Sequence, residues 1–196
     1  MPYPKGHKLK VRSHIITSAA KAFRTHGVRN ISLPHIMKGA GLTHGGFYSH
    51  FANKDQLVME TCHFAISDTI DTLQRIADQN KNEDQTPIEA VIDFYLSPLH
   101  RDQTEAGCIL PALSGEVAQL PENIRQAYTQ ELQRFIAFIT NMAGIDPSNS
   151  YALVSSMVGT VALARAVSDE KFSDALLQAG LVQIKQMVSA GSRFPS

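Results

Sequence analysis

The chain has 196 residues, of which 43% are hydrophobic, and its 18 basic side chains balance 18 acidic ones. This length suits one or two small domains with a buried core, and the lack of a run of about 18 apolar residues argues against a membrane-spanning helix. The basic N-terminal segment lacks the apolar core of a secretion signal. The two cysteines, Cys62 and Cys108, suit neither a disulfide framework nor a zinc site. We therefore expect a cytoplasmic protein with no membrane partner.

Three short helices are predicted within the first 53 residues. Apolar residues recur at helical spacing in a first segment, which Gly27 should end in a left-handed conformation. Ser32 is expected to cap a second helix and Thr43 a third. Gly45 and Gly46 are unusual inside that third helix, because each should cost about 0.5–1 kcal/mol relative to alanine. They indicate either a frayed helix or a backbone that approaches a binding partner closely.

The same N-terminal segment is strongly basic. Residues 1–54 hold nine Lys or Arg residues, six of the eight histidines and no Asp or Glu, whereas the remaining 142 residues carry nine basic and 18 acidic side chains. This asymmetry indicates an end that binds nucleic acid, with a solvated basic face as the alternative. Two short helices joined by a glycine-containing turn in such a segment predict a helix-turn-helix motif.

Six further helices are predicted after residue 53. The second of them opens with Thr86, Pro87 and Glu89, which supply a cap, a first-turn proline and a capping-box acid. The six are expected over about residues 54–79, 87–99, 110–118, 124–142, 147–168 and 171–190, with breaks over residues 80–85 and 100–107. We therefore expect an all-α fold of about nine helices, with a three-helix domain over residues 1–53 and a second helical domain over residues 54–196.

One run of residues is familiar. Residues 41–57 read GLTHGGFYSHFANKDQL, which resembles the signature of the TetR family of bacterial repressors: a Gly-apolar-Ser/Thr turn, a Tyr, an aromatic-flanked Phe, and a Lys followed by an acid and Leu. The resemblance covers about residues 10–60. It implies a DNA-binding transcriptional regulator, a ligand-released repressor that binds a palindromic operator as a homodimer. The last two helices are implied to form the contact between the two copies.

The resemblance also implies roles for matched positions in contact with double-stranded DNA. Major-groove contacts are implied for Thr43, His44, Gly45 and Gly46. Phosphate contacts are implied for Ser32, Tyr48, His50 and Lys54. The alternatives are that Tyr48 is a packed aromatic residue and that Lys54 is a solvated residue in the first helical turn.

The second domain is implied to bind a small effector, which we expect to be moderately apolar because no charged constellation converges there. Candidate lining residues, with plain core as the alternative, are Phe64, Phe94, Tyr95, Leu99, Cys108, Leu110, Tyr128, Phe135 and Met157. Small residues in the last two helices, among them Gly159 and Gly180, favour close packing against a second copy. Cys108 follows Gly107 near Arg101, so it is either an electrophile-sensing thiol or a structural one.

Catalytic and cofactor motifs do not occur in the sequence. The sequence contains no G-x-S-x-G, no H-E-x-x-H, no phosphate-binding loop and no G-x-G-x-x-G. We therefore expect no enzyme activity, no cofactor and no metal. A DNA-binding protein that only shapes DNA, without responding to a ligand, stays open as another function.

Overall fold

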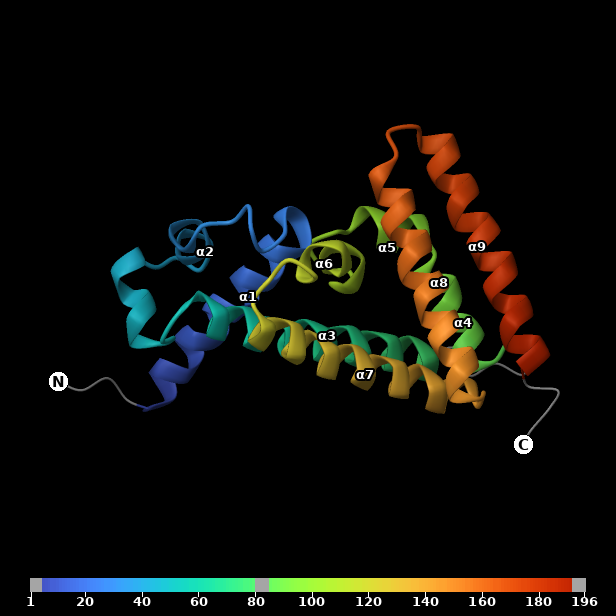
Figure 1. Cartoon of the computed structure of the whole chain (residues 1–196), viewed down its shortest axis with the longest axis horizontal. Coiled ribbons are helices and arrows are strands. Elements are labelled where there is room, and N and C mark those ends of the chain that lie inside the picture. The colour runs from blue at the N-terminus through green and yellow to red at the C-terminus, as the bar shows by residue number, and fades with distance from the viewer. Residues whose placement is uncertain (1–4, 80–84, 192–196) are drawn as a thin grey trace. The chain divides into compact units, whose positions relative to one another are not determined.

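The computed structural model describes residues 5–79 and 85–191, and within these ranges every regular element is a helix (Figure 1). The ten helical segments are α1 (Lys5–His26), α2 (Leu33–Gly39), the 3₁₀-helix η1 (His44–Ser49), α3 (Lys54–Gln79), α4 (Pro87–Tyr95), α5 (Pro98–Asp102), α6 (Leu110–Val117), α7 (Glu122–Ala143), α8 (Pro147–Ala166) and α9 (Glu170–Gly191). The all-α prediction is confirmed.

Local capping chemistry explains most of the helix starts. The Ser32 hydroxyl accepts a hydrogen bond from the backbone N–H of His35 at 3.4 Å at the start of α2. Thr86 and Glu89 form the reciprocal capping box that opens α4. Each such cap satisfies backbone N–H groups that have no partner inside the helix. These starts were therefore readable from the sequence.

Two helices differ from the prediction. The segment predicted as one helix over residues 87–99 is divided, because Pro98 cannot continue a helix and forces Ser97 into an extended conformation (φ −85°, ψ 154°). The Ser97 hydroxyl then accepts a hydrogen bond from His100 N and starts α5, which extends to Asp102 in the predicted break. The third helix is a 3₁₀-helix, and the Thr43 side chain caps nothing among the described residues.

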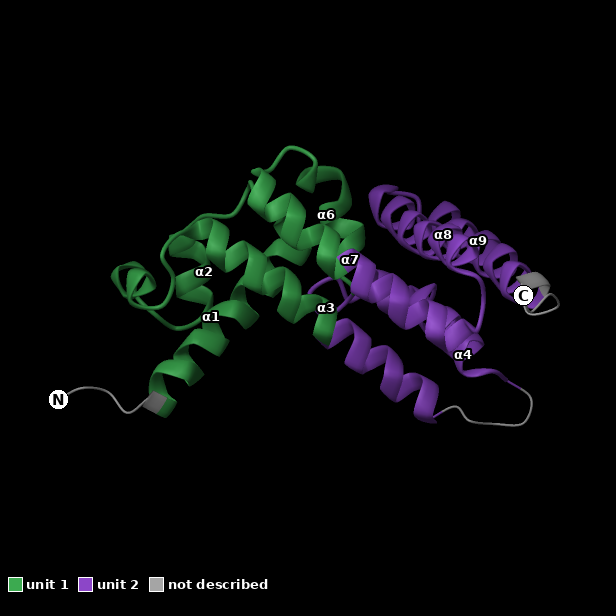
Figure 2. Ribbon diagram, turned by 60° about the horizontal axis from the view of Figure 1, so that its bottom comes forward, with its two compact units in different colours: residues 1–67, 108–131 green, residues 68–107, 132–196 purple. Residues whose placement is uncertain are grey.

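The chain divides into two compact units, which Figure 2 shows in green and purple. Unit 1 contains residues 1–67 and 108–131, and unit 2 contains residues 68–107 and 132–196. Helices α3 and α7 each contribute residues to both units. The domain boundary predicted at residue 53 concerns function rather than compactness, and it stays a prediction.

Each unit has its own core. In unit 1, α1 packs on α2 and α6, and α2 packs on η1. In unit 2, α8 and α9 form an extensive pair, and α4 packs on both of them. Fully buried residues of unit 1 include Ile15, Phe23, Ile36, Met37, Phe47 and Leu57, and those of unit 2 include Leu73, Tyr95, Phe135, Leu153 and Met157.

Close packing of α8 on α9 depends on Gly180. A Cβ atom at this position would lie 2.6 Å from Cγ2 and 2.7 Å from Oγ1 of Thr160 on α8. Gly180 therefore serves a contact within one chain, and its contact with a second copy stays a prediction. Gly159 is different, since a Cβ atom there would meet nothing within 4 Å.

Alanine substitutions at these two glycines should have opposite effects on stability. Gly180→Ala should lower the free energy of unfolding by about 1–3 kcal/mol, because the added methyl overpacks the contact with Thr160. Gly159→Ala should raise it by about 0.5–1 kcal/mol, because alanine is the better helix former. Thermal denaturation at one fixed protein concentration measures both. Equal shifts in the same direction would contradict this account of the α8–α9 contact.

Candidate nucleic-acid interface

Helix α2, the four residues that follow it and η1 form a helix-turn-helix within unit 1. The turn contains Gly41 at φ +72° and is closed by a hydrogen bond from Leu42 N to Met37 O at 2.9 Å. η1 is anchored by Phe47, which is fully buried and stacks on the ring of Phe51 with centroids 5.5 Å apart. Because a six-residue 3₁₀-helix has little stability of its own, this aromatic anchor holds it in place.

The outer surface of η1 presents few side chains. Thr43, His44 and Gly45 are exposed, and the exposed fraction of Tyr48 is 65%. The Tyr48 ring has edge contacts with His44 and Phe47, at centroid distances of 6.4 and 5.2 Å. Tyr48 is therefore not a buried aromatic residue. A Cβ atom at Gly45 would meet nothing within 4 Å, so packing within the protein does not explain this glycine.

His50 is half-buried at the end of η1. Burial lowers the pKa of its imidazole, and the nearby positive charges of Lys8 and Arg12 lower it further. Its Nδ1 atom is buried and has no hydrogen-bond partner among the described residues. The phosphate contact of His50 stays a prediction.

Lys54 lies where α3 begins, and its ammonium group is used within the protein. Nζ donates to the carbonyl oxygens of Val28 at 2.7 Å and of Ile31 at 2.8 Å. Burial lowers the pKa of this ammonium group, although Glu116 and Asp55 act in the opposite direction. With two of its three N–H donors occupied, Lys54 has one left for the phosphate contact, which stays a prediction.

Sequence reasoning missed an ion pair in unit 1. The Arg12 guanidinium pairs with the Glu60 carboxylate through both terminal nitrogens, Nη1 and Nη2, with Nη2 at 2.6 Å from Oε1. The Arg12 Cζ atom also lies over the Phe51 ring, 4.3 Å from its centroid. The hydrogen bonds from Arg12 lower the pKa of Glu60. Residues 1–54, which contain no Asp or Glu, are called the acid-free segment below. One of its positive charges is therefore balanced by the Glu60 carboxylate of α3. Its partner lies 48 residues away, and no local pattern indicates it.

The predicted effector-binding residues fall in both units. In unit 1, Cys108 and Leu110 are buried, Phe64 is half-buried, and the hydroxyl of Tyr128 lies 2.8 Å from that of Ser114. In unit 2, Tyr95, Phe135 and Met157 are fully buried and Phe94 is half-buried. Leu99 is 54% exposed, which suits a surface residue better than the lining of an enclosed pocket. The effector role of the set stays a prediction.

Tyr95 is the centre of an aromatic cluster in unit 2. Its ring centroid lies 4.5 Å from that of His100 and 6.4 Å from that of Phe135. The His100 Nδ1 atom lies 2.7 Å from the carbonyl oxygen of Tyr95. The structure therefore brings together two predicted lining residues with a histidine that was not predicted.

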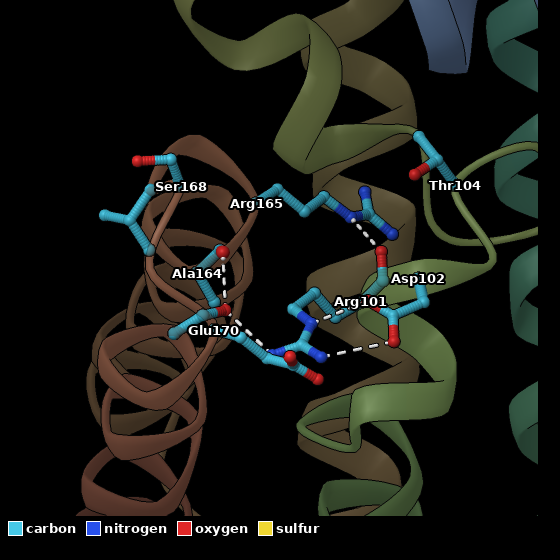
Figure 3. Close-up of a pocket in the computed structure, with 9 residues that line it drawn as sticks. Arg101, Asp102, Thr104, Ala164, Arg165, Ser168 and Glu170 are labelled. Carbon is cyan, nitrogen blue, oxygen red and sulfur yellow. Dashed lines mark hydrogen bonds and ion pairs between the residues drawn. The ribbon is translucent and has the colours of Figure 1, made fainter.

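A polar pocket of about 410 Å³ in unit 2 is lined by residues of α5, α8 and α9 (Figure 3). Arg101 donates to the carboxylates of Asp102 at 2.7 Å and Asp174 at 2.6 Å. Arg165 donates to the carbonyl oxygens of Arg101 at 3.0 Å and His100 at 2.8 Å. The guanidinium groups are thus engaged in holding α5 against α8 and α9, and two carboxylates balance the charge of Arg101.

The two thiols are both buried. Burial, with a smaller contribution from Glu131, raises the pKa of Cys62 to about 12, so this thiol is protonated at neutral pH. Cys108 is 1% exposed. Among the described residues, no three His, Cys, Asp or Glu side chains are placed to share a metal ion, and no helix has the length and apolar character to span a membrane.

The comparisons with known proteins agree with the helix-turn-helix geometry. The model of the family described as "Bacterial regulatory proteins, tetR family" matches residues 15–61. The chain belongs to the TetR family. ArpR of Pseudomonas putida, a probable HTH-type transcriptional regulator, is 30% identical over 161 residues, which cover 81% of this chain and 66% of ArpR.

Other known proteins match a shorter part of the sequence or share the fold at lower identity. The probable acrEF/envCD operon repressor of Escherichia coli is 41% identical over 56 residues, which is 29% of this chain and 26% of that protein. Among solved structures, reduced NemR of E. coli superposes with a TM-score of 0.73 at 18% identity, covering 90% of this chain and 96% of NemR. A TetR regulator from Cytophaga hutchinsonii gives 0.70 at 18% identity, covering 92% and 96%. These structures share the fold.

Proposed function

We propose that the protein is a non-enzymatic DNA-binding transcriptional regulator, and that it is a repressor released by a small effector. The observation that carries this proposal is the helix-turn-helix of unit 1, whose η1 is anchored from inside by Phe47 and exposes His44 and Tyr48. A short helix fixed in this way in a basic segment has the geometry of a recognition element in the major groove.

The electrostatics of unit 1 support this proposal. The acid-free segment carries nine Lys and Arg residues, of which Arg12 is paired with Glu60. A DNA duplex carries a dense row of phosphates, and contacts from such cations release its condensed counterions. Phosphate contacts from Ser32, Tyr48, His50 and Lys54 and groove contacts from residues 43–46 are the specific form of the proposal.

Dimerisation is supported by exposed apolar side chains on α8 and α9. Large apolar residues that are about half exposed or more are Tyr151, Leu163, Phe172 and Val182. On α9, residues 172, 175, 179 and 182 are exposed and apolar, and their spacing of three, four and three places them on one stripe of the helix. A second copy would cover this stripe, and two-fold symmetry would then predict a palindromic operator.

The regulatory step would be a population shift. An effector that favours one orientation of α3 would move Lys54 and Glu60, which hold parts of the acid-free segment. The two copies of η1 would then no longer fit two half-sites at once, and the protein would leave the operator.

The dependence of operator affinity on salt tests this function. A duplex selected from random sequence should bind. If the protein makes six to ten phosphate contacts, raising the salt from 50 to 200 mM should weaken binding about 10³- to 10⁵-fold. Fluorescence anisotropy across this range measures the effect, with a scrambled duplex of equal length as control. Affinity that is flat with salt, or equal for both duplexes, would refute the proposal. Footprinting distinguishes the architectural alternative, which predicts continuous coverage instead of one protected palindrome.

Thiol sensing is a second candidate mode of regulation. Its supporting observation is the place of Cys108, two residues before α6, the helix that carries Glu116 to the α1–α2 connection. Cys108 is nearly fully buried, so an electrophile would reach it only after local opening. Cys108→Ser should abolish release from the operator by an electrophile such as N-ethylmaleimide. Release that persists in this variant would remove the candidate.

A further inference from the structure

The connection between α1 and α2 forms a small anion-binding hollow of backbone N–H groups. Gly27 has φ +76°, and the next two N–H groups, those of Val28 and Arg29, point at one carboxylate. Successive N–H groups in such a turn are known to bind anions. The anion here is the side chain of Glu116 on α6, with Oε2 at 2.8 Å from Val28 N and Oε1 at 2.5 Å from Arg29 N.

Gly27 is required for this contact for two reasons. Its backbone conformation is one that other residues rarely adopt, and a Cβ atom would lie 2.5 Å from Oε2 of Glu116. The glycine therefore provides both the turn and the space that the carboxylate occupies. Arg29 adds a side-chain contact to Gln119, two residues after the end of α6.

The backbone carbonyl oxygens of the same connection are held by a cation. Lys54 Nζ donates to the carbonyl oxygens of Val28 and Ile31, both of which are buried residues. The peptide groups of residues 27–31 thus lie between a carboxylate from α6 and an ammonium group from α3. Helix α2 starts directly afterwards, with Ser32 as its cap, so this clamp fixes where the helix-turn-helix begins.

We infer that Glu116 is a positioning residue for DNA binding, which makes α6 the element that controls the start of the helix-turn-helix. The inference rests on the proposed DNA-binding function. Movement of α6 would withdraw the carboxylate from Val28 and Arg29 and leave two backbone N–H groups without their acceptor. The connection would then lose its fixed conformation, and α2 its fixed starting point.

The charge of Glu116 gives the test a clear sign. An acid beside a basic DNA-binding segment repels phosphate, so removing it should strengthen binding if charge alone matters. If Glu116 positions the connection, removing its charge should weaken binding instead. The two explanations therefore predict changes of opposite sign.

The experiment compares Glu116→Gln with Glu122→Gln in the full chain. Glu122 is an exposed residue of unit 1 paired with Arg125, so its substitution removes the same charge without touching the clamp. Glu116→Gln should weaken operator binding about tenfold or more, because two hydrogen bonds to a charged acceptor are impaired. Glu122→Gln should bind as the wild type or slightly more tightly. Operator affinity of Glu116→Gln equal to or above wild type would overturn the inference.

Hydrogen exchange of the Val28 and Arg29 amides gives a second readout that does not depend on DNA. In Glu116→Gln both amides should exchange at least about tenfold faster, while Glu122→Gln leaves them unchanged. Unchanged protection in Glu116→Gln would refute the clamp. If the wild type binds no duplex, the proposed function fails, while the amide exchange still decides whether the clamp exists. Glu116→Asp, which keeps the charge but shortens the reach, serves if Glu116→Gln does not fold.

Discussion

Replacing Phe47 by alanine should abolish specific operator binding. Phe47 is fully buried and stacks on Phe51, and Phe→Ala substitutions in a core cost about 3–5 kcal/mol. η1 has only six residues and cannot replace that energy with its own hydrogen bonds. We therefore expect η1 to lose its fixed position, and operator affinity to fall by about 100-fold or more, since each 1.4 kcal/mol is a factor of ten.

Fluorescence anisotropy for affinity and circular dichroism for thermal unfolding measure this effect together. Tyr48→Ala is the matched control, because it truncates an exposed aromatic side chain next to Phe47. Exposed substitutions usually change stability by no more than about 0.5 kcal/mol, so this control should weaken binding through lost contacts while leaving unfolding unchanged. Near-normal affinity in Phe47→Ala would show that η1 is not the recognition element.

The second large effect is expected from Leu163→Glu together with Phe172→Glu. Both residues are more than half exposed, on α8 and α9 respectively. Charges placed in an apolar interface lose hydration without gaining a partner. A dimer formed through the exposed apolar residues of α8 and α9 should therefore dissociate. The mass in solution should fall from twice 21.5 kDa to 21.5 kDa.

The affinity for the operator should also fall when the dimer dissociates. Linking two half-site contacts raises avidity about 10²- to 10⁴-fold over a single contact, and the monomer loses this factor. Size exclusion with light scattering and anisotropy on one palindrome measure both effects. Gln130→Glu, which adds a charge at an exposed residue of α7, is the control and should leave mass and affinity unchanged. A double variant that remains dimeric would place the interface elsewhere.

Local chemistry made much of the fold readable from sequence. Ser32 and Thr86 cap the helices they were expected to cap, because a cap depends on residues three positions apart. The same local reasoning missed the interruption at Pro98, where apolar periodicity continued across a residue that breaks a helix. The 3₁₀ form of η1 was also missed, because helical spacing over six residues does not distinguish the two helix types.

The parts of the site that sequence did not reveal depend on long-range pairs. Glu116 reaches Val28 across 88 residues, and Arg12 reaches Glu60 across 48. For Lys54 the family resemblance implied a phosphate contact. In the structure, two backbone carbonyl groups accept hydrogen bonds from Lys54, and no local pattern indicates them. Such partners become visible only when the packing of α1, α3 and α6 is known.

The 3₁₀ form of η1 limits how much sequence information one copy could read from DNA. At about 2.0 Å of rise per residue, six residues extend about 10 Å, which corresponds to about three base pairs at 3.4 Å each. Two copies would then read about six base pairs, enough to tell apart about 4,000 sequences, whereas a genome offers about 10⁶ or more competing sites. The spacing of the half-sites and the bendability of the DNA between them would have to supply the remaining discrimination.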